Sequence, residues 1–367
     1  MPKKILIIFW GHPLFDGRCV NMTTQLLNSN HDVYIMGVGN KSEIISYKKS
    51  TIQLIDKNLL NNSWTKYFQY FQYAKKIIKL QQPDVIIASD LYSMIPSAQI
   101  KSQHNAKIIY DSRELYTQLG GLKNKPLIQK IWSWYEKKYI LKTDCVVANA
   151  EIDRDYLHKV YNHPNIQIMK NFPGEYFLKD KNISLKEQLC LDEETHIFLY
   201  QGKFHEGRGI RFSIKCISKI KKAVLVLIGE GPMKPLYIQA AEKENMHDRL
   251  IIMDAVPYED LASFARQAFI GLSIIQPISK SYEHALPNKL FEYAVSGLPM
   301  ICSNLKAMAE VVNQYKHGIV IKYNSKIEFH EAYQKILNNY NDYILNIELR
   351  KNLLWKKNNN LDNLINE

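Results

Sequence analysis

The chain has 367 residues, of which 46% are hydrophobic and 23% are charged. This length predicts two domains of ordinary size, and the composition excludes general disorder. No apolar run approaches the roughly 18–20 residues of a membrane-spanning helix, and the short apolar start at residues 5–10 lacks a signal-peptide cleavage site. The five cysteines are far apart, which disfavours a zinc site or a disulfide framework and is typical of a reducing cytoplasm.

The net charge of +12 is concentrated in the first half of the chain. Residues 1–170 contain 23 lysines and arginines against 13 acidic residues, whereas residues 171–367 contain 25 against 23. A basic half of this kind is typical of proteins that meet a nucleic acid, an anionic membrane surface or an anionic substrate. A basic surface without any specific partner is the alternative.

In chain order, short apolar runs alternate with longer helical patterns, and this alternation occurs twice. The first half has expected strands at 5–10, 33–36, 85–88, 108–110 and 145–148, with helices at 19–28, 64–80, 126–141 and 153–161. The second half has expected strands at 197–200, 224–228, 250–253, 270–274 and 300–302. This alternation predicts an α/β fold of two doubly wound, Rossmann-like domains that join near residues 171–174.

The loops that follow the strands are the places where doubly wound sheets bind ligands. The loop after the first strand holds Gly11 and Gly17, but their spacing is not that of a dinucleotide-binding motif, and no P-loop motif is present. The first strand of the second half runs into QGKFHEGRG at residues 201–209. There Lys203 and Arg208 could neutralise two phosphate charges at a helix entry. A flexible loop with incidental charges is the alternative.

The stretch SYEHALPNKLFEYAVSGLPM at residues 281–300 predicts a helix that receives an anion. Pro287 suits a helix start, and Asn288 and Lys289 offer amides and a cation near the N-terminus. Glu292, one turn later, could accept hydrogen bonds from the two adjacent hydroxyls of a ribose. A capped core helix with a surface glutamate is the alternative. A diphosphate beside a ribose indicates a nucleotide.

Taken together, these motifs resemble those of the family 4 glycosyltransferases, which are retaining, nucleotide-sugar-dependent enzymes with the GT-B fold. The resemblance rests on residues 202–209, 229–232 and 287–299 in the second half, and on residues 16–18 and 110–116 in the first half. It implies two Rossmann-like domains that face each other across a cleft. Residues 1–172 would bind the acceptor, residues 173–345 would bind the donor, and a helix within residues 346–367 would pack back on the first domain.

The resemblance also implies roles for individual residues. The expected substrate-binding residues are Gly17, Arg18, Lys203, Arg208, Asn288, Lys289, Leu290 and Glu292, with the cations and the start of the helix on the donor diphosphate. A first motif glutamate faces the transferred sugar in the family. Strict spacing from Glu292 places His284 there, whereas charge favours Glu283, which we take as the catalytic candidate. Arg113 stands where many relatives have histidine and is the second catalytic candidate.

These expectations describe a glycosyltransferase that moves a sugar from a UDP- or GDP-linked donor to a glycan or lipid-linked acceptor. Its place would be bacterial-type surface polysaccharide or glycoconjugate synthesis, with retention of the anomeric configuration. Positive charge would stabilise the departing diphosphate. Neither a metal nor a cofactor is expected.

Aromatic and basic residues at helical spacing in 64–80 and 130–139 are typical of a surface that meets lipid headgroups. The aromatic stripe could instead pack on the sheet. A cytoplasmic enzyme, peripheral on the inner face of an anionic membrane, is compatible with both. The other classes left open are a GT-B sugar-nucleotide epimerase and a non-catalytic binder of an anionic polymer or membrane. No nucleic-acid partner is expected, because no base-reading motif is present.

Overall fold

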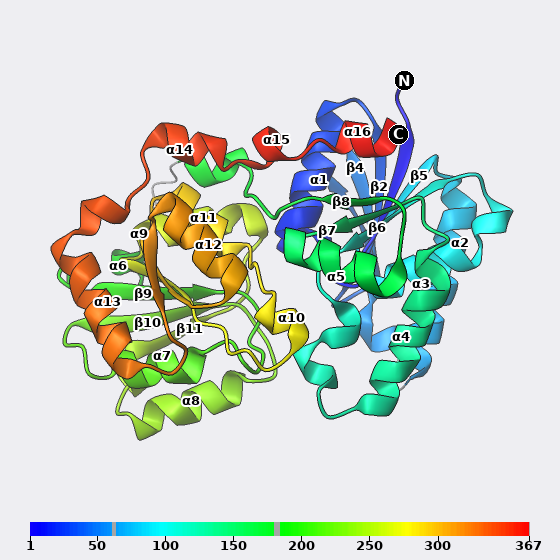
Figure 1. Cartoon of the computed structure of the whole chain (residues 1–367). Helices are drawn as coiled ribbons and strands as arrows, with labels where there is room; N and C mark the ends of the chain where they lie inside the picture. Colours follow the sequence, from blue (N-terminus) through cyan, green and yellow to red (C-terminus); the bar gives the residue numbers. More distant parts are fainter. Residues whose placement is uncertain (61–63, 180–183, 367) are drawn as a thin grey trace. The chain divides into compact units, whose positions relative to one another are not determined.

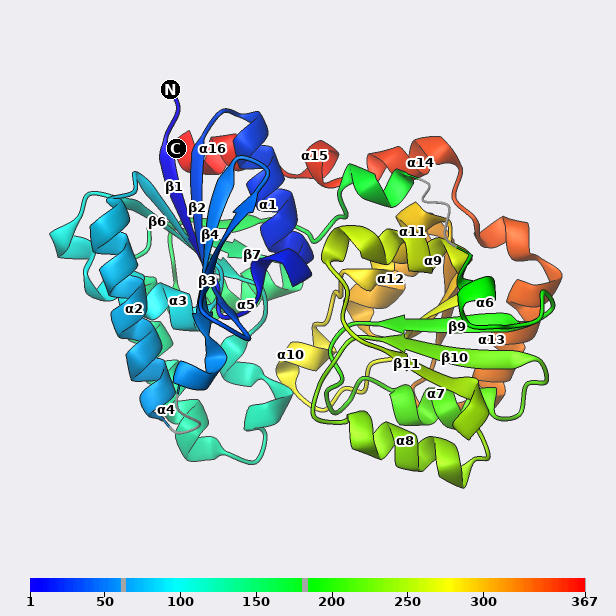
Figure 2. The same cartoon turned by 180° about the vertical axis from the view of Figure 1, so that it is seen from behind.

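The computed structural model describes residues 1–60, 64–179 and 184–366, and the chain divides into two compact units. Unit 1 comprises Met1–Lys170 together with Asn359–Glu367, and unit 2 comprises Asn171–Asn358. Each unit contains one sheet of mainly parallel strands with helices on both faces (Figure 1, Figure 2). The predicted fold class, two doubly wound Rossmann-like sheets, is confirmed. Three parts of the predicted domains lie outside the described residues. They are residues 61–63 of the first domain (1–172), residues 180–183 of the second (173–345) and residue 367 of the C-terminal helix segment (346–367).

The sheet of unit 1 has the strand order β3-β4-β2-β1-β5-β6-β7-β8, and only β3 and β4 are antiparallel neighbours. The strands are β1 (Lys4–Ile8), β2 (Asp32–Gly39), β3 (Glu43–Tyr47), β4 (Ser50–Asp56), β5 (Val85–Ala88), β6 (Lys107–Ser112), β7 (Cys145–Ala148) and β8 (Ile166–Ile168). The helices are α1 (Gly17–Asn28), α2 (Thr65–Gln81), α3 (Leu91–Gln99), α4 (Pro126–Ile140), α5 (Glu151–Tyr161) and α16 (Leu361–Asn366). The central strands are apolar throughout because helices cover both of their faces.

Helices α2 to α5 share one hydrophobic core on one face of this sheet, and α1 and α16 contact each other on the other face. In the expected stripe of α2, Phe71, Ala74 and Ile78 are buried in that core, and Tyr67 is partly buried and packs against it. These residues therefore pack on the sheet, which was the alternative to a surface that meets lipid headgroups. The exposed aromatic residues of this region are different ones and are described below.

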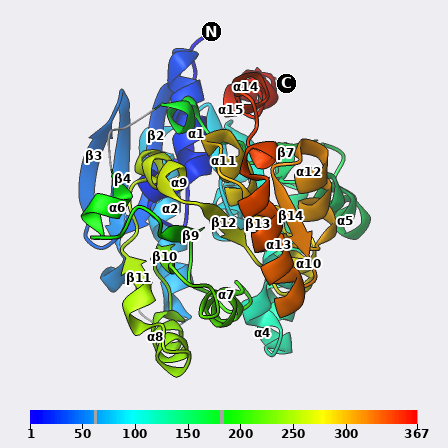
Figure 3. The same ribbon diagram turned by 90° about the vertical axis from the view of Figure 1, so that its left-hand side faces the viewer.

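The sheet of unit 2 has the order β11-β10-β9-β12-β13-β14, and all neighbours are parallel. The strands are β9 (His196–Gln201), β10 (Ala223–Ile228), β11 (Leu250–Met253), β12 (Ile270–Ser273), β13 (Met300–Ser303) and β14 (Gly318–Ile321). The helices are α6 (Leu185–Gln188), α7 (Ile210–Ile217), α8 (Lys234–Lys243), α9 (Leu261–Gln267), α10 (Lys280–Glu283), α11 (Lys289–Ser296), α12 (Lys306–Tyr315), α13 (Lys326–Asn338), α14 (Ile347–Asn352) and α15 (Trp355–Asn358). Helices α9 and α11 lie on the face of the sheet opposite to α7 and α8 (Figure 3).

The structure adds elements that the sequence pattern does not predict. These are the hairpin of β3 and β4, the short strand β8, the edge strand β14 and several helices, including α3. Where one C-terminal helix was expected, the chain forms the three short helices α14, α15 and α16. Only the last of these belongs to unit 1, because unit 2 extends to Asn358.

Candidate functional site

The carboxyl ends of β9 and β12 are the place in unit 2 where a ligand is expected. These strands are neighbours, and the chain proceeds from β9 to β10 on one side and from β12 to β13 on the other. Ligands of doubly wound sheets bind beyond the strand ends at such a reversal of strand order. The loop 202–209 follows β9, and the segment 274–288 follows β12. The predicted donor-site residues therefore share one edge of the sheet.

Two glycine-containing loops at this edge are packed against each other. Gly229 and Gly231 follow β10 with φ values of +146° and +151°, which glycine adopts more readily than other residues. A Cβ atom on Gly229 would lie 2.1 Å from the carbonyl oxygen of Gly202, and one on Gly231 would lie 2.5 Å from that of Phe204. The Phe204 amide donates at 2.7 Å to the carbonyl of the residue between the two glycines. The first part of the loop after β9 is therefore held in place.

Lys203 and Arg208 supply positive charge in the loop after β9. Lys203 is exposed, and its Nζ atom lies 2.7 Å from Oε1 of Glu230. The Arg208 guanidinium lies over the ring of Tyr282, 4.7 Å from the ring centroid. Tyr282 belongs to α10, so Arg208 connects the segments that follow the two neighbouring strands. An anionic ligand at this edge would meet both cations.

Lys289 is a buried cation at the first position of α11. Its Nζ atom lies 3.6 Å from the ring centroid of Tyr200, where the negative face of the ring attracts the ammonium group. Burial lowers the pKa of Lys289 well below its usual value, the Arg208 charge lowers it further, and Glu292 opposes both effects. A phosphate group near Lys289 and Arg208 would offset their repulsion and raise this pKa.

The start of α11 carries three of the expected donor-site residues, which are Asn288, Lys289 and Leu290. Asn288 precedes the first helical residue, and its side chain makes no capping hydrogen bond. The Leu290 amide donates to the Pro287 carbonyl oxygen at 3.1 Å, and the Leu290 side chain is buried. The Leu290 side chain therefore contributes to packing, and the expected place of Leu290 along the diphosphate stays a prediction. Asn288 and Lys289 are the residues of this turn whose polar side chains suit an anion.

Glu292 is buried, with 3% of its surface exposed, and both of its carboxylate oxygens accept hydrogen bonds. The Tyr258 hydroxyl donates to Oε1 at 2.8 Å, and Nε2 of Gln201 donates to Oε2 at 2.5 Å. Sequence reasoning missed both partners, because they lie 34 and 91 positions from Glu292 along the chain. The sequence offered one signal for the Gln201 contact, which is that the apolar strand β9 ends in this polar residue.

The two candidates for a group that faces the transferred sugar are adjacent in sequence but differ in burial. Glu283 is the last residue of α10 and is exposed, whereas only 7% of the His284 surface is exposed. Both follow β12 and lie in the segment that leads to α11. The choice between them stays a prediction.

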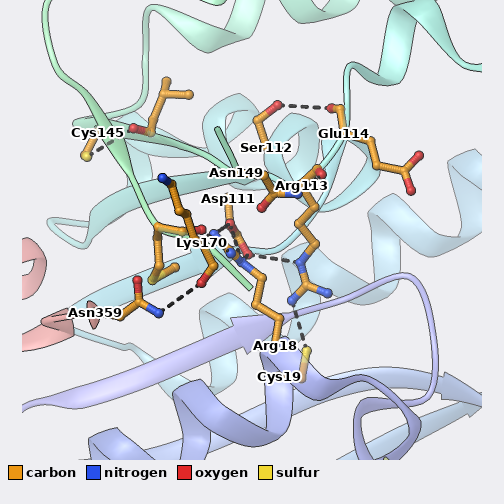
Figure 4. Close-up of polar contacts among 12 residues, drawn as sticks. Arg18, Cys19, Asp111, Ser112, Arg113, Glu114, Cys145, Asn149, Lys170 and Asn359 are labelled. Carbon is orange, nitrogen blue, oxygen red and sulfur yellow. Dashed lines mark hydrogen bonds and ion pairs between the residues drawn. The ribbon is translucent and has the colours of Figure 1, made fainter. Parts of the chain in front are cut away.

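In unit 1, Arg18 and Arg113 lie in a buried cluster around Asp111, which is on β6 (Figure 4). Nη2 of Arg18 lies 2.6 Å from Asp111, and Nη1 donates to the Met169 carbonyl oxygen at 2.5 Å. Nε of Arg113 donates to Asp111 at 3.0 Å, and Nη1 donates to Asp16 at 2.7 Å. Burial alone would raise the pKa of Asp111, but the two guanidinium groups outweigh it and hold this pKa below its usual value.

This cluster gives both arginines protein partners. Nη2 of Arg113 donates to Sγ of Cys19 at 3.2 Å, so Nε and both terminal nitrogens have protein partners. The Arg18 and Arg113 side chains are 1% and 9% exposed. Both arginines therefore hold α1 and the loop before it against β6. The roles expected of Arg18 in substrate binding and of Arg113 in catalysis stay predictions. Gly17 is buried at the start of α1, behind Asp16, which caps the helix by accepting from the Cys19 amide at 2.8 Å.

Two further features bear on metals and membranes. An Asp-x-Asp sequence, the usual reason to expect a divalent metal in a glycosyltransferase, occurs at residues 153–155. It lies on α5, with Asp153 buried and Asp155 exposed. In the described part of the chain, no three His, Cys, Asp or Glu side chains are grouped so that they could hold a metal ion. Over the same residues, no helix is both long and apolar enough to cross a bilayer. Metal independence stays a prediction.

Two family models match the chain, one in each unit. The model described as Glycosyltransferase Family 4 matches residues 18–172, and the model described as Glycosyl transferases group 1 matches residues 195–339. A chitobiosyldiphosphodolichol beta-mannosyltransferase of Debaryomyces hansenii is 21% identical over 332 residues, which cover 79% of this chain and 69% of that protein.

Solved structures share the fold. Sucrose-phosphate synthase from Thermosynechococcus elongatus is similar with a TM-score of 0.77 at 16% identity, covering 99% of this chain and 96% of that one. HepE of Anabaena, in complex with UDP-glucose, gives a TM-score of 0.67 at 11% identity, covering 97% and 93%. Because the two family models together match most of the chain, it belongs to the GT-B glycosyltransferases of group 1 and family 4, enzymes that use a nucleotide-sugar donor.

Proposed function

We propose that unit 2 binds the donor through the residues around the ends of β9 and β12. The supporting observation is the concentration of Lys203, Arg208 and Lys289 at one sheet edge, beside the buried carboxylate of Glu292. The cations suit a diphosphate, and the carboxylate suits the hydroxyls of a ribose. When the bond between sugar and diphosphate breaks, negative charge grows on the diphosphate. Cations already in place stabilise that charge more strongly in the transition state than in the ground state.

The donor is a UDP- or GDP-linked sugar in this proposal. The HepE structure, which holds UDP-glucose, supports the UDP alternative. Thermal-shift measurements against UDP, GDP and their common sugar derivatives distinguish the two, because a ligand of the native state raises the melting temperature according to its affinity. A panel in which no nucleoside diphosphate or nucleotide sugar raises the melting temperature would contradict the proposed donor site.

The reaction we propose is transfer of the sugar to an acceptor hydroxyl with retention of configuration and without a metal. Activity should therefore persist in EDTA, and NMR of the product should show the anomeric configuration of the donor. An inverted product would contradict retention, and loss of activity in EDTA would contradict metal independence. Formation of an epimerised sugar from the donor alone would favour the epimerase alternative.

Unit 1 is proposed to bind a glycan or lipid-linked acceptor, and its surface carries a group of exposed apolar side chains. Trp64 and Phe68, at the start of α2, are 50% and 64% exposed, and Leu127 and Trp134 of α4 are 75% and 55% exposed. The rings of Trp64 and Trp132 stack with centroids 6.0 Å apart, which connects the start of α2 to α4. Such exposed apolar groups on neighbouring helices suit contact with lipid.

Lysines accompany this apolar surface. Lys130, Lys137 and Lys138 of α4 are exposed, and Nζ of Lys138 lies 4.6 Å from the ring centroid of Trp134. Aromatic rings beside lysines suit the headgroup region of an anionic membrane. We infer a peripheral protein of the inner membrane face that acts in surface polysaccharide or glycoconjugate synthesis. The name of the Debaryomyces hansenii relative, which gives a dolichol-linked acceptor, supports a lipid-linked substrate.

A further inference from the structure

The hydrogen bonds around Glu292 include a buried acceptor that has no partner. Gln201 is 2% exposed, and its Nε2 donates to Glu292 at 2.5 Å. Its Oε1 is buried and has no hydrogen-bond partner among the described residues. Reversing the amide would place this oxygen against the carboxylate, so Glu292 fixes the orientation of the amide. A buried acceptor of this kind is unfavourable unless a ligand or a water supplies a donor.

Tyr258 holds the other oxygen of the Glu292 carboxylate. It begins a turn that follows β11, and it is 4% exposed. Its ring packs against those of Tyr176 and Phe177, with centroid distances of 5.7 Å and 5.4 Å. Glu292 is therefore fixed by two side chains that come from different strand ends, and one of them is itself locked by aromatic packing.

We propose that Gln201 and Tyr258 are positioning residues that fix the Glu292 carboxylate for the donor ribose, and so make the site selective for ribonucleotides over 2′-deoxyribonucleotides. Each carboxylate oxygen has a second lone pair, so Glu292 can accept a ribose hydroxyl while it keeps both protein hydrogen bonds. Oε1 of Gln201 supplies a further acceptor beside it. A site built from acceptors rejects an analogue that lacks the hydroxyl, because the acceptors then lose a partner. This inference rests on the proposed contact of Glu292 with ribose.

Isothermal titration calorimetry with UDP and 2′-deoxy-UDP tests the inference, with the guanine pair in their place if the wild type prefers GDP. The wild type should bind the ribonucleotide about tenfold or more tightly than the deoxynucleotide. Tyr258→Phe and Gln201→Leu should each lose most of this ratio by weakening the ribonucleotide. Affinity for the deoxynucleotide should stay within about twofold of wild type.

A matched control is Tyr333→Phe, because Tyr333 is a buried tyrosine of the same unit. Its hydroxyl lies 2.9 Å from Nδ1 of His196, at the opposite end of β9 from Gln201. This variant should keep the wild-type ratio. Melting temperatures of all variants report on folding. A Tyr258 or Gln201 variant that melts early but keeps the ratio would have a merely structural role, which contradicts the proposal.

The possible results separate the inference from the function on which it rests. Wild-type discrimination in Tyr258→Phe and Gln201→Leu would overturn the inference and leave donor binding intact. A wild type that binds UDP and 2′-deoxy-UDP equally would overturn the ribose contact of Glu292 as well. A wild type that binds no nucleoside diphosphate would overturn the proposed donor site. Either variant decides the question if the other does not fold.

Discussion

Lys203 and Glu292 are proposed to hold different parts of the same nucleotide, so each should be needed for affinity. Lys203→Ala and Glu292→Ala should each weaken nucleoside diphosphate binding by about 1.5–3 kcal/mol, or roughly 10- to 150-fold in Kd, because each removes a charge-assisted hydrogen bond. Calorimetric titration measures the effect. The control is Lys222→Ala, since Lys222 is also an exposed lysine of unit 2 with an acidic partner, Glu194, but precedes β10. Wild-type affinity in both site variants would contradict the proposed placement.

Lys289 should make nucleotide binding depend on pH. Its pKa is lowered by burial and by Arg208, and a bound diphosphate should raise it, so binding should take up a proton. Affinity should be highest below the lowered pKa and should fall as the pH rises through it. Titrations in two buffers of different ionisation enthalpy measure the proton uptake.

Lys289→Arg is the informative variant, because a guanidinium stays protonated and should remove this pH dependence. The same pH dependence in Lys289→Arg would contradict the assignment. The effect on folding has the opposite sign. The unfolded chain holds this proton more tightly, so the free energy of unfolding should rise with pH between the lowered pKa and the usual lysine value.

Glu283 is our candidate for the group that faces the transferred sugar. A carboxylate stabilises developing positive charge at the anomeric carbon better than a neutral imidazole does. Glu283→Gln should therefore keep donor affinity while kcat falls by about 100-fold or more, and His284→Ala should be nearly silent. Steady-state kinetics, with nucleotide affinity measured separately, provide the test. The reverse pattern would assign the role to His284, and full activity in both variants would exclude both residues.

The shared sheet edge of the proposed donor-site residues could be predicted because the signals are local in sequence, whereas their contacts with a donor stay predictions. Lys203 and Arg208 stand five positions apart in one glycine-containing loop, and Lys289 and Glu292 share one turn of a helix. The contact of Arg113 with Asp16 could not be predicted in the same way. Its partner Asp16 lies 97 positions away, and only the fold brings the two together.

Helix α4 should bind unit 1 to anionic membranes through its exposed lysines. Replacing Lys130, Lys137 and Lys138 with glutamate should release the protein from vesicles that contain anionic lipid, because each surface lysine contributes about 1 kcal/mol. Salt should weaken wild-type binding, since it screens these charges. Vesicle sedimentation measures the bound fraction.

A matched triple replacement in unit 2 serves as the control. Lys219, Lys221 and Lys222 are exposed lysines that lie between α7 and β10, and replacing them with glutamate makes the same change in net charge. This control should still sediment with the vesicles. Equal wild-type binding to neutral vesicles at high salt would contradict the electrostatic account.

The buried strands could be predicted because each one is a continuous apolar run, which can be identified in the sequence without knowing the neighbouring strands. β1, β5 and β7 are apolar along their whole length except for Lys4 at the start of β1. The elements that were missed have weaker patterns. β3 is partly exposed on both faces and pairs only with β4, and β8 has three residues. Their pairing with a neighbour, rather than their own composition, makes them strands.

The C-terminal segment should stabilise unit 1 although the residues between it and the rest of that unit, Asn171–Asn358, all belong to unit 2. Leu361 and Ile365 are buried, and Asp362 pairs with His31 at 3.1 Å. Ending the chain at Asn358 should therefore cost about 3–6 kcal/mol of unfolding free energy in unit 1, from the loss of two buried apolar side chains. Urea unfolding, followed by the tryptophan fluorescence, measures the change.

The control for this truncation is a chain that ends at Ile365 and so keeps both buried side chains. It should unfold at nearly the wild-type urea concentration. If the chain that ends at Asn358 had the wild-type urea midpoint of unfolding, the C-terminal segment would not contribute to the stability of unit 1.

The ion pair between Lys203 and Glu230 means that the Glu230 carboxylate would compete with a bound diphosphate for Lys203. A diphosphate that takes Lys203 must displace the Glu230 carboxylate, so part of the attraction is offset when the donor binds. In the proposed site, the same carboxylate would pair with Lys203 again once the sugar has been transferred, which would hasten departure of the nucleoside diphosphate. Since product release limits many enzymes, a weaker hold on the nucleotide is compatible with a faster catalytic cycle.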